Sequence, residues 1–242
     1  KSALTAKLPI KPAMLRMEND ARIALAGATG NEPGIILIAG TGSIALGMDH
    51  EGRRVRVGGW GPVLGDEGSG YSIGKAALIA VLREYDRRGQ PTSLTDRLLS
   101  HLGITSPEEL ISLVYQGPLQ RPEIAKLAEI VLEEAAQGDA VGQCLVDTAA
   151  RQLVDMIGAV LRRLDREDKP TTIAGIGGLL RPGNLMWETI TQILAEVYPQ
   201  SRLAPPLLPP ELGAILLGRD YLDRASPHPE FIQNLTLYSH AL

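Results

Sequence analysis

Apolar residues along the chain form short continuous runs near the start and longer helical patterns further on. The segment GIILIAGTGSIALGM, residues 34–48, has a continuous apolar run typical of a buried strand, then a Gly-Thr-Gly-Ser break, then a second apolar run. After a turn at 50–52, arginine and valine alternate, which predicts a third strand. Residues 34–59 are therefore predicted to form a three-stranded antiparallel meander.

Helical periodicity dominates the rest of the chain. The longest pattern, residues 139–164, places Leu153, Ile157 and Leu161 on one apolar stripe. A further strand is predicted at 171–180, followed by an extended segment from Ser201. The predicted helices span residues 20–29, 69–88, 92–102, 106–115, 121–137, 139–164, 184–197 and 210–222. This order of elements predicts an α/β fold with a mixed sheet flanked by helices.

Composition narrows the class of protein. The chain has 242 residues, 44% of them hydrophobic, and a net charge of −4, which suffices for one large domain or two modest ones with real cores. No basic run points to nucleic acid as a partner, and no apolar run approaches the roughly 18 residues that a membrane span needs. A single cysteine, Cys144, excludes a disulfide framework and is predicted to be a small buried residue of a helix. We expect a cytoplasmic protein.

The break between the first two strands is a possible phosphate site. Gly40, Thr41, Gly42 and Ser43 combine outward-facing backbone amides with two hydroxyl groups, and such a concavity suits phosphate oxygens. The pattern of a Walker A loop is absent. The alternative is an ordinary glycine-rich turn between two strands.

A second glycine-rich loop, AGIGGLLRPGN at 174–184, follows the later strand. Its glycines permit close approach of a flat or charged ligand just before a helix begins, although a plain strand-to-helix turn is the alternative. Two glycine-rich loops that each follow a strand are stronger evidence for a ligand site than either loop alone.

Two aspartates stand beside predicted helix starts. Asp20 is best explained as an N-cap, with a general base as the functional alternative. Asp66 precedes a helix together with Glu67, where the helix dipole favours acidic residues. Alternatively, the glycines around Asp66 present its carboxylate to a polyhydroxylated ligand, beside Trp60 as an aromatic face or a core residue. The four histidines lack metal-ligand spacing, and we assign no metal ligand.

Taken in order, five motifs resemble the N-acetylglucosamine kinases within the BadF/BadG/BcrA/BcrD ATPase family. They are NDA (19–21), GTGS, GGWGPVLGDEGSGY (58–71), GIGG (175–178) and PPELGAILLG (209–218), of which the third is the specific one. The resemblance covers nearly the whole chain. It implies the actin-like, RNase-H-like fold of sugar kinases, in which ATP and sugar meet between two lobes.

The resemblance also implies domains and roles. Residues 1–33 would be a remnant of the N-terminal lobe with the interlobe segment, 34–222 the C-terminal lobe, and 223–242 a tail that packs back on the N-terminal lobe. Asp20 would be the base that takes the proton from the sugar hydroxyl. The residues implied for ATP are Gly40, Thr41, Gly42, Ala125, Gly177, Gly178 and Pro182, and those implied for the sugar are Asp20, Ser43, Gly59, Trp60, Gly61 and Asp66. ATP and Mg²⁺ are the implied cofactors, and a homodimer is common among similar kinases.

The chain departs from the family pattern in two ways. The Asp-Gly-Gly-Gly hairpin whose aspartate usually organises the Mg²⁺ is absent from the sequence, and Ile44 stands where N-acetylglucosamine kinases carry an amide. We therefore expect an N-terminally truncated or partly covered chain that lacks most of the N-terminal lobe and is inactive by itself. The exact sugar stays open.

Three functions are compatible with these patterns. The first is an ATP-dependent kinase that phosphorylates a hydroxyl, O6, of N-acetylglucosamine or glucosamine. The second is a non-catalytic sugar or nucleotide sensor on the same scaffold. The third is an activating ATPase of the BcrA/BcrD type, which would need cysteine ligands for a bridging iron–sulfur cluster, whereas this sequence has one cysteine.

Overall fold

The computed structural model describes residues 17–223 and 229–239. The chain divides into two compact units, of which the larger comprises Ile35–Pro205. The smaller takes the described residues before and after that range. The assignment of residues 1–33 to an N-terminal lobe, 34–222 to a C-terminal lobe and 223–242 to a tail stays a prediction.

In the described part of the chain, five strands form one sheet of the order β3-β2-β1-β4-β5. The strands are β1 (Gly34–Ala39), β2 (Ser43–Met48), β3 (Arg54–Gly58), β4 (Thr171–Ile176) and β5 (Ser201–Ala204). β2 pairs antiparallel with β3, whereas β1 pairs parallel with β4, and β4 with β5. The prediction of a mixed sheet is confirmed, and the three predicted strands of 34–59 lie side by side.

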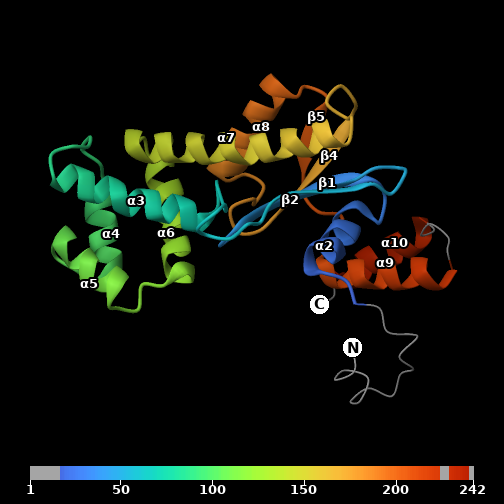
Figure 1. Cartoon of the computed structure of the whole chain (residues 1–242), viewed down its shortest axis with the longest axis horizontal. Helices are drawn as coiled ribbons and strands as arrows, with labels where there is room; N and C mark the ends of the chain where they lie inside the picture. Colours follow the sequence, from blue (N-terminus) through green and yellow to red (C-terminus); the bar gives the residue numbers. More distant parts are fainter. Residues whose placement is uncertain (1–16, 224–228, 240–242) are drawn as a thin grey trace, which may run out of the picture. The chain divides into compact units, whose positions relative to one another are not determined.

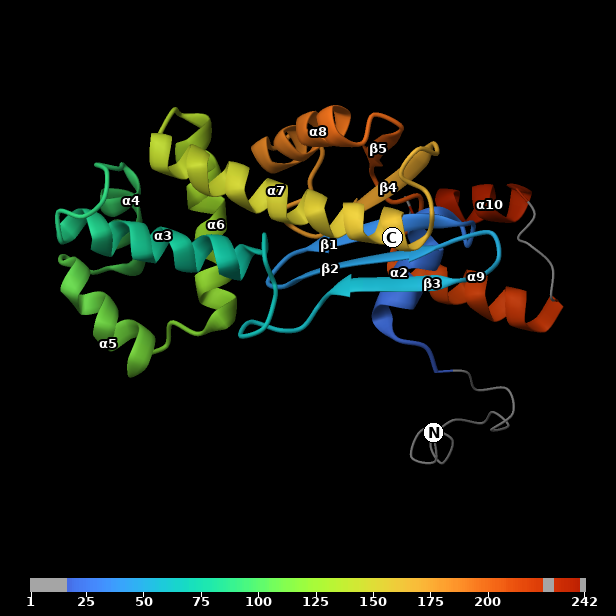
Figure 2. The same ribbon diagram turned by 45° about the horizontal axis from the view of Figure 1, so that its top comes forward.

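Two helices, α7 (Ala140–Arg163) and α8 (Leu185–Val197), lie on one face of this sheet (Figures 1 and 2). The apolar stripe predicted for α7 is buried, with Leu153, Ile157 and Leu161 at most 1% exposed. α7 comes so close to β2 that a Cβ atom at Gly47 would lie 2.5 Å from the Val160 side chain. A larger residue at this position would push the helix off the sheet.

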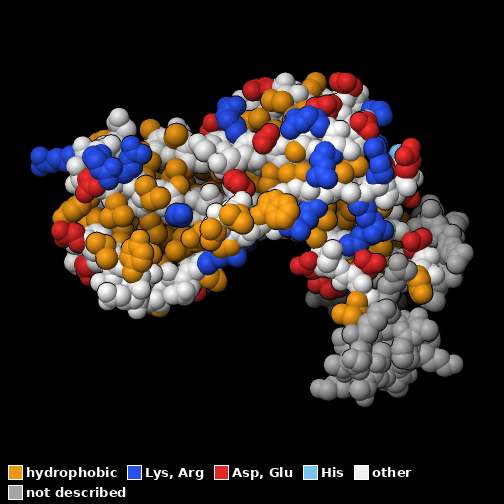
Figure 3. All heavy atoms as spheres, viewed as in Figure 1, with side chains coloured by type: hydrophobic (Ala, Val, Ile, Leu, Met, Phe, Trp, Pro, Cys, Tyr) orange, Lys and Arg blue, Asp and Glu red, His pale blue; other side chains and the backbone are white. Residues whose placement is uncertain are grey.

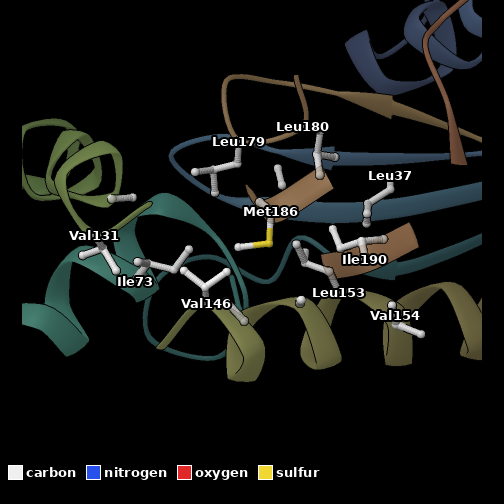
Figure 4. Packing of buried hydrophobic residues seen from close by; sticks show 14 of the residues in the cluster. Leu37, Ile73, Val131, Val146, Leu153, Val154, Leu179, Leu180, Met186 and Ile190 are labelled. Carbon is white, nitrogen blue, oxygen red and sulfur yellow. The ribbon is translucent and has the colours of Figure 1, made fainter. Parts of the chain in front are cut away.

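The remaining helices of the larger unit form an extension beside the sheet. They are α3 (Gly70–Tyr85), α4 (Leu94–Leu102), the short 3-10 helix η2 (Pro107–Glu109), α5 (Leu110–Tyr115) and α6 (Arg121–Ala136). Figure 4 shows that the core continues into them, from Leu37 and Met186 beside the sheet to Ile73 and Val131 between α3 and α6. Large hydrophobic side chains also reach the surface here, Tyr115 among them, and Figure 3 shows hydrophobic side chains gathered over this end of the unit.

β3 is an edge strand of the described sheet and carries charge. Arg54 and Arg56 are exposed on it. The guanidinium of Arg163 in α7 donates a hydrogen bond to the Arg56 carbonyl over 3.0 Å. This contact satisfies one backbone acceptor at the edge.

The smaller unit is helical in its described part. It contains α2 (Asp20–Thr29), α9 (Pro210–Asp223) and α10 (Pro229–Ser239). A Cβ atom at Gly213 of α9 would lie 2.1 Å from the Ile23 carbonyl, so α2 and α9 touch backbone to backbone. α2 has the predicted bounds and ends at Gly30 in the left-handed conformation. α10 was not predicted, because residues 223–242 were interpreted as a tail.

Two predictions about single residues are wrong. The N-cap of α2 is Asn19, whose side chain accepts the Arg22 N–H at 2.7 Å, whereas Asp20 is the first residue of the helix itself. Cys144 lies in α7 as predicted, but it is exposed because it falls off the apolar stripe that faces the core. Among the described residues, no helix is both long and apolar enough to cross a membrane.

Candidate functional site

The glycine-rich loops lie at the same edge of the sheet. β1 and β4 are parallel neighbours in a register that pairs Ile35 with Ile173 and Ile38 with Ile176. Each strand therefore delivers the loop that follows it to the same side. In open α/β sheets, ligands bind outside the carboxyl ends of the strands, so this edge is the natural place for a site.

Gly177 ends β4 and brings its loop against the end of β1. Its φ is 112°, and a Cβ atom here would lie 2.2 Å from the Ala39 carbonyl oxygen. No other residue fits both requirements. The strand predicted to reach residue 180 therefore stops at 176. Gly178 and Pro182 follow as exposed positions, and a Cβ atom at Gly178 would meet nothing within 4 Å.

The loop at residues 40–42 is closed by backbone hydrogen bonds. The Gly40 N–H donates to the Gly42 carbonyl over 2.9 Å, and the Gly40 carbonyl accepts the N–H of Gly70, the first residue of α3, over 2.8 Å. Thr41 is exposed between the two glycines. The loop thus presents Thr41 while its own polar groups hold the shape.

Ser43, at the start of β2, links this loop to the one that carries Asp66. Its side chain is buried, and its backbone N–H donates to Asp66 Oδ1 over 3.2 Å. Its hydroxyl donates to the Glu67 carbonyl over 2.7 Å. The Gly-Thr-Gly-Ser loop and the loop of Asp66, which are separate motifs in the sequence, therefore form one hydrogen-bonded unit.

Asp66 is held in an unusual conformation. Its φ is 65°, in the left-handed region that few residues other than glycine adopt, and its side chain is only 5% exposed. The Ser69 N–H donates to its carbonyl over 3.1 Å. Ser69 in turn caps α3 by accepting the Ser72 N–H, so the helix predicted from residue 69 begins at Gly70. Such strain persists where surrounding contacts fix it, which is common at functional sites.

Arg121 was missed by the sequence analysis. It is the first residue of α6, and its guanidinium pairs with Asp66 Oδ2. The pair lies directly against Gly42, where a Cβ atom would be 2.8 Å from Asp66 Oδ1 and 2.9 Å from Arg121 Nη2. A separation of 55 residues hides this contact from any local pattern.

Trp60 is a surface residue and so not part of the core. Its side chain is 66% exposed, and the Arg56 guanidinium stacks over its ring at 4.7 Å from the centroid. Arg56 Nη2 also donates to the Gly59 carbonyl over 2.6 Å. Gly59 and Gly61 on either side both have positive φ, 68° and 84°. The loop thereby displays a flat aromatic face to solvent.

Ala125 is brought to the site by the crossing of α3 and α6, seen in Figures 1 and 2. A Cβ atom at Gly70 would lie 2.9 Å from the Ala125 carbonyl, and one at Gly74 would lie 1.9 Å from the Ile124 carbonyl. The N-terminal end of α6 therefore carries both Arg121 and Ala125 beside the start of α3.

Asp20 belongs to the smaller unit. Its side chain is exposed, and Oδ1 accepts the Ala21 N–H over 2.8 Å. Of the four histidines, His50 and His101 are exposed, while His228 and His240 lie outside the described residues. Within the described residues, no group of three or more histidine, cysteine or acidic side chains could hold a metal ion.

Comparisons with known proteins agree with one another. Residues 3–218 match the model of the BadF/BadG/BcrA/BcrD ATPase family. The N-acetylmuramic acid/N-acetylglucosamine kinase of Clostridium acetobutylicum is 37% identical over 205 residues, 85% of this chain and 67% of its own. The N-acetyl-D-glucosamine kinase of Dictyostelium discoideum is 38% identical over 206 residues, 84% of this chain and 64% of its own.

A similar fold is known from a crystal structure. It is that of a Chromobacterium violaceum protein described as a candidate N-acetylglucosamine kinase, which superposes with a TM-score of 0.71 at 28% identity. The alignment covers 90% of this chain and 70% of that protein. The chain thus spans roughly two thirds of the length of its curated relatives.

Proposed function

The chain belongs to the BadF/BadG/BcrA/BcrD ATPase family, and from that premise we propose that it is an ATP-dependent amino-sugar kinase. The reaction would transfer the γ-phosphate of ATP to the 6-hydroxyl group (O6) of N-acetylglucosamine or glucosamine. The observation that carries the proposal is the pair of hydrogen bonds made by Ser43. This one buried residue hydrogen-bonds both to Asp66 and to the Glu67 carbonyl, and so couples a phosphate-type loop to a buried carboxylate suited to sugar hydroxyls.

ATP would bind along the loops at the carboxyl edge of β1 and β4. The backbone amides and hydroxyl of Gly40, Thr41 and Gly42 suit the phosphate oxygens. Gly177, Gly178 and Pro182 would border the adenosine on one side and Ala125 on the other. The open space at Gly178 and the exposure of Pro182 support this assignment. When bound, Mg²⁺ would supply charge neutralisation of the phosphates.

The amino sugar would contact the loop of residues 58–69. The Asp66 carboxylate would accept hydrogen bonds from two hydroxyl groups, and Ser43 lies next to it. Gly59 and Gly61 would expose backbone to the sugar, and the exposed ring of Trp60 offers an apolar face to it.

Asp20 would act as the general base. The sugar hydroxyl oxygen attacks the γ-phosphorus, the bond between that phosphorus and the β,γ-bridging oxygen breaks, and the hydroxyl proton passes to the Asp20 carboxylate. The products are the sugar phosphate and ADP. The exposure of the Asp20 side chain at a helix start supports this role. With ATP as co-substrate, we place the protein in the cytoplasm, and we propose a homodimer by analogy with similar kinases.

The test is ADP release by the protein, with any residues that its gene encodes before Lys1, against a panel of amino sugars and neutral hexoses. We expect turnover with N-acetylglucosamine or glucosamine, and a product phosphate that NMR places on O6. We expect none from the 242-residue chain alone. Absence of sugar-dependent turnover in the longer protein would reject the proposal.

A further inference from the structure

The Asp66 carboxylate is buried and needs a cation. Its side chain is 5% exposed, and the guanidinium of Arg121 pairs with it through Oδ2. A carboxylate taken out of water without an opposite charge is strongly disfavoured. Arg121 therefore supplies the opposite charge that the buried Asp66 carboxylate requires.

The pairing leaves acceptor sites on the carboxylate unused. An ionised carboxylate has about four acceptor sites on its two oxygens. The Ser43 N–H takes a site on Oδ1, and Arg121 takes one on Oδ2. Each oxygen keeps an acceptor site, so by its hydrogen-bonding capacity the carboxylate could accept from two hydroxyl groups and keep both existing partners.

Arg121 is itself held in place. It starts α6 beside Pro122 in the first turn, which restricts the backbone there. Its guanidinium carbon lies 5.9 Å from the centroid of the Tyr71 ring. Gly42 lies close as well, since a Cβ atom at this position would be 2.9 Å from Arg121 Nη2. The guanidinium therefore pairs with Asp66 and lies beside Tyr71 and Gly42.

We propose that Arg121 is a positioning residue for the sugar site, which acts through Asp66 by pairing with its carboxylate and holding it oriented toward the sugar hydroxyls. This inference rests on the proposed kinase function. It also gives Gly42 a second role beside phosphate binding, because any side chain at that position would collide with the Asp66–Arg121 pair.

One competing role follows from the same geometry. Arg121 Nη2 is next to the phosphate-type loop, so the guanidinium could instead contact a phosphate of ATP directly. The two roles predict effects on different substrates: a positioning role changes the affinity for sugar, whereas a phosphate contact changes the affinity for ATP or kcat.

The experiment is a double-mutant cycle in the longer protein. The variants are Arg121→Gln, Arg121→Lys, Asp66→Asn and the double variant Arg121→Gln/Asp66→Asn, with thermal unfolding measured for each. The matched control is Arg151→Gln, which breaks an exposed Arg–Asp pair on α7. For each protein, kcat and the KM values for sugar and ATP are determined, together with the Kd for sugar by calorimetry.

We expect Arg121→Gln to raise the sugar KM and Kd about tenfold or more while the ATP KM stays within about twofold. Arg121→Lys should restore part of the sugar affinity. In the Asp66→Asn background, the further change at Arg121 should alter the sugar Kd by less than about twofold, because its target carboxylate is already lost.

Two results would overturn the inference while leaving the proposed kinase intact. One is a large rise of the ATP KM or fall of kcat in Arg121→Gln with the sugar KM unchanged. The other is a full effect of Arg121→Gln on the sugar Kd in the Asp66→Asn background. A parent protein with no sugar-dependent turnover would instead reject the proposed function, and this inference with it.

Discussion

The hydroxyl of Ser43 donates a hydrogen bond to the backbone carbonyl of Glu67 over 2.7 Å, and so fastens the first residue of β2 to the loop of Asp66. In Ser43→Ala the N–H bond to Asp66 can persist, but the Glu67 carbonyl loses its partner. We expect a loss of about 1 kcal/mol in the free energy of unfolding. We also expect the sugar KM to rise more than the ATP KM.

Urea unfolding and steady-state kinetics check this prediction. Ser100→Ala, which removes an exposed hydroxyl in α4, serves as the control and should change neither quantity. Equal stability of Ser43→Ala and the parent would show that the hydroxyl contributes nothing to joining the two loops.

Gly177 and Gly178 form a matched pair of neighbouring positions. Gly177→Ala combines a positive φ with a Cβ atom 2.2 Å from the Ala39 carbonyl, so we expect it to cost about 3 kcal/mol or more in the free energy of unfolding. Gly178→Ala meets open space and should keep the stability within about 0.5 kcal/mol. Its effect should instead fall on the ATP KM, if this loop borders the adenosine. Equal stability losses for the two variants would contradict the close approach of Gly177 to the Ala39 carbonyl and the open space at Gly178.

Variants at Asn19 and Asp20 distinguish a residue that caps a helix from a residue that takes part in catalysis. Asn19→Ala removes the side chain that accepts the Arg22 N–H. We expect this to lower the free energy of unfolding of the smaller unit by about 1 kcal/mol, as measured by thermal unfolding. Asp20→Asn should leave the melting temperature nearly unchanged but lower kcat by about 10²–10⁴. An Asp20→Asn protein with normal kcat would remove Asp20 from the role of base.

Asp139 gives the stability of the larger unit a dependence on pH. Burial raises the pKa of its carboxyl, but hydrogen bonds donated by Gly142, Ser93 and Thr92 outweigh burial, so the pKa lies below its ordinary value of 3.8. A depressed pKa in the folded state means that its stabilisation is complete above the unfolded pKa and is lost as the pH falls through the folded one.

We therefore expect Asp139→Ala to cost about 1–2 kcal/mol at pH 7, since the residue is also the N-cap of α7. The gap between this variant and the parent should narrow as the pH falls below about 4. Urea unfolding at pH values from 7 to 3 measures this difference in the free energy of unfolding. Asp147→Ala, in an exposed pair with Arg151, should show a much smaller gap throughout.

Trp60 offers a direct optical readout of sugar binding. The 242-residue sequence has two tryptophans, so the longer protein carries Trp187→Phe and a phenylalanine at any tryptophan encoded before Lys1, which leaves the exposed Trp60 as the reporter. We expect N-acetylglucosamine to shift the emission of Trp60 to shorter wavelength as its ring leaves water. An emission spectrum unchanged at a sugar concentration that saturates turnover would place Trp60 outside the sugar site.

Local signals in the sequence were enough to predict most elements. α2 could be bounded because its alanine-rich run ends at Gly30, and α7 because its apolar stripe repeats over many turns. The family inferred from the five motifs is confirmed. Strand β4 was predicted too long because apolar residues continue past Gly177, where the backbone already turns away from the sheet.

The rest depends on contacts between distant residues. Nothing around Arg121 indicates that it will meet Asp66, because their pairing arises only when α6 crosses α3 at the glycines of the latter. The exposure of Trp60 likewise follows from the positive φ angles of its neighbours rather than from its own type. Sequence patterns therefore located the loops of the site, whereas the contacts that fix its carboxylate had to come from the structure.

The arginines of β3 have a consequence for how the protein behaves at high concentration. An exposed edge strand is a template on which a second chain can extend the sheet and begin to aggregate. Here Arg54 and Arg56 place charge along that edge, and Arg163 already occupies the Arg56 carbonyl. A second molecule that approached by β3 would bring the same charges against its own. Sheet-to-sheet growth from this edge is thus opposed, and copies of the chain that associate would do so through other surfaces.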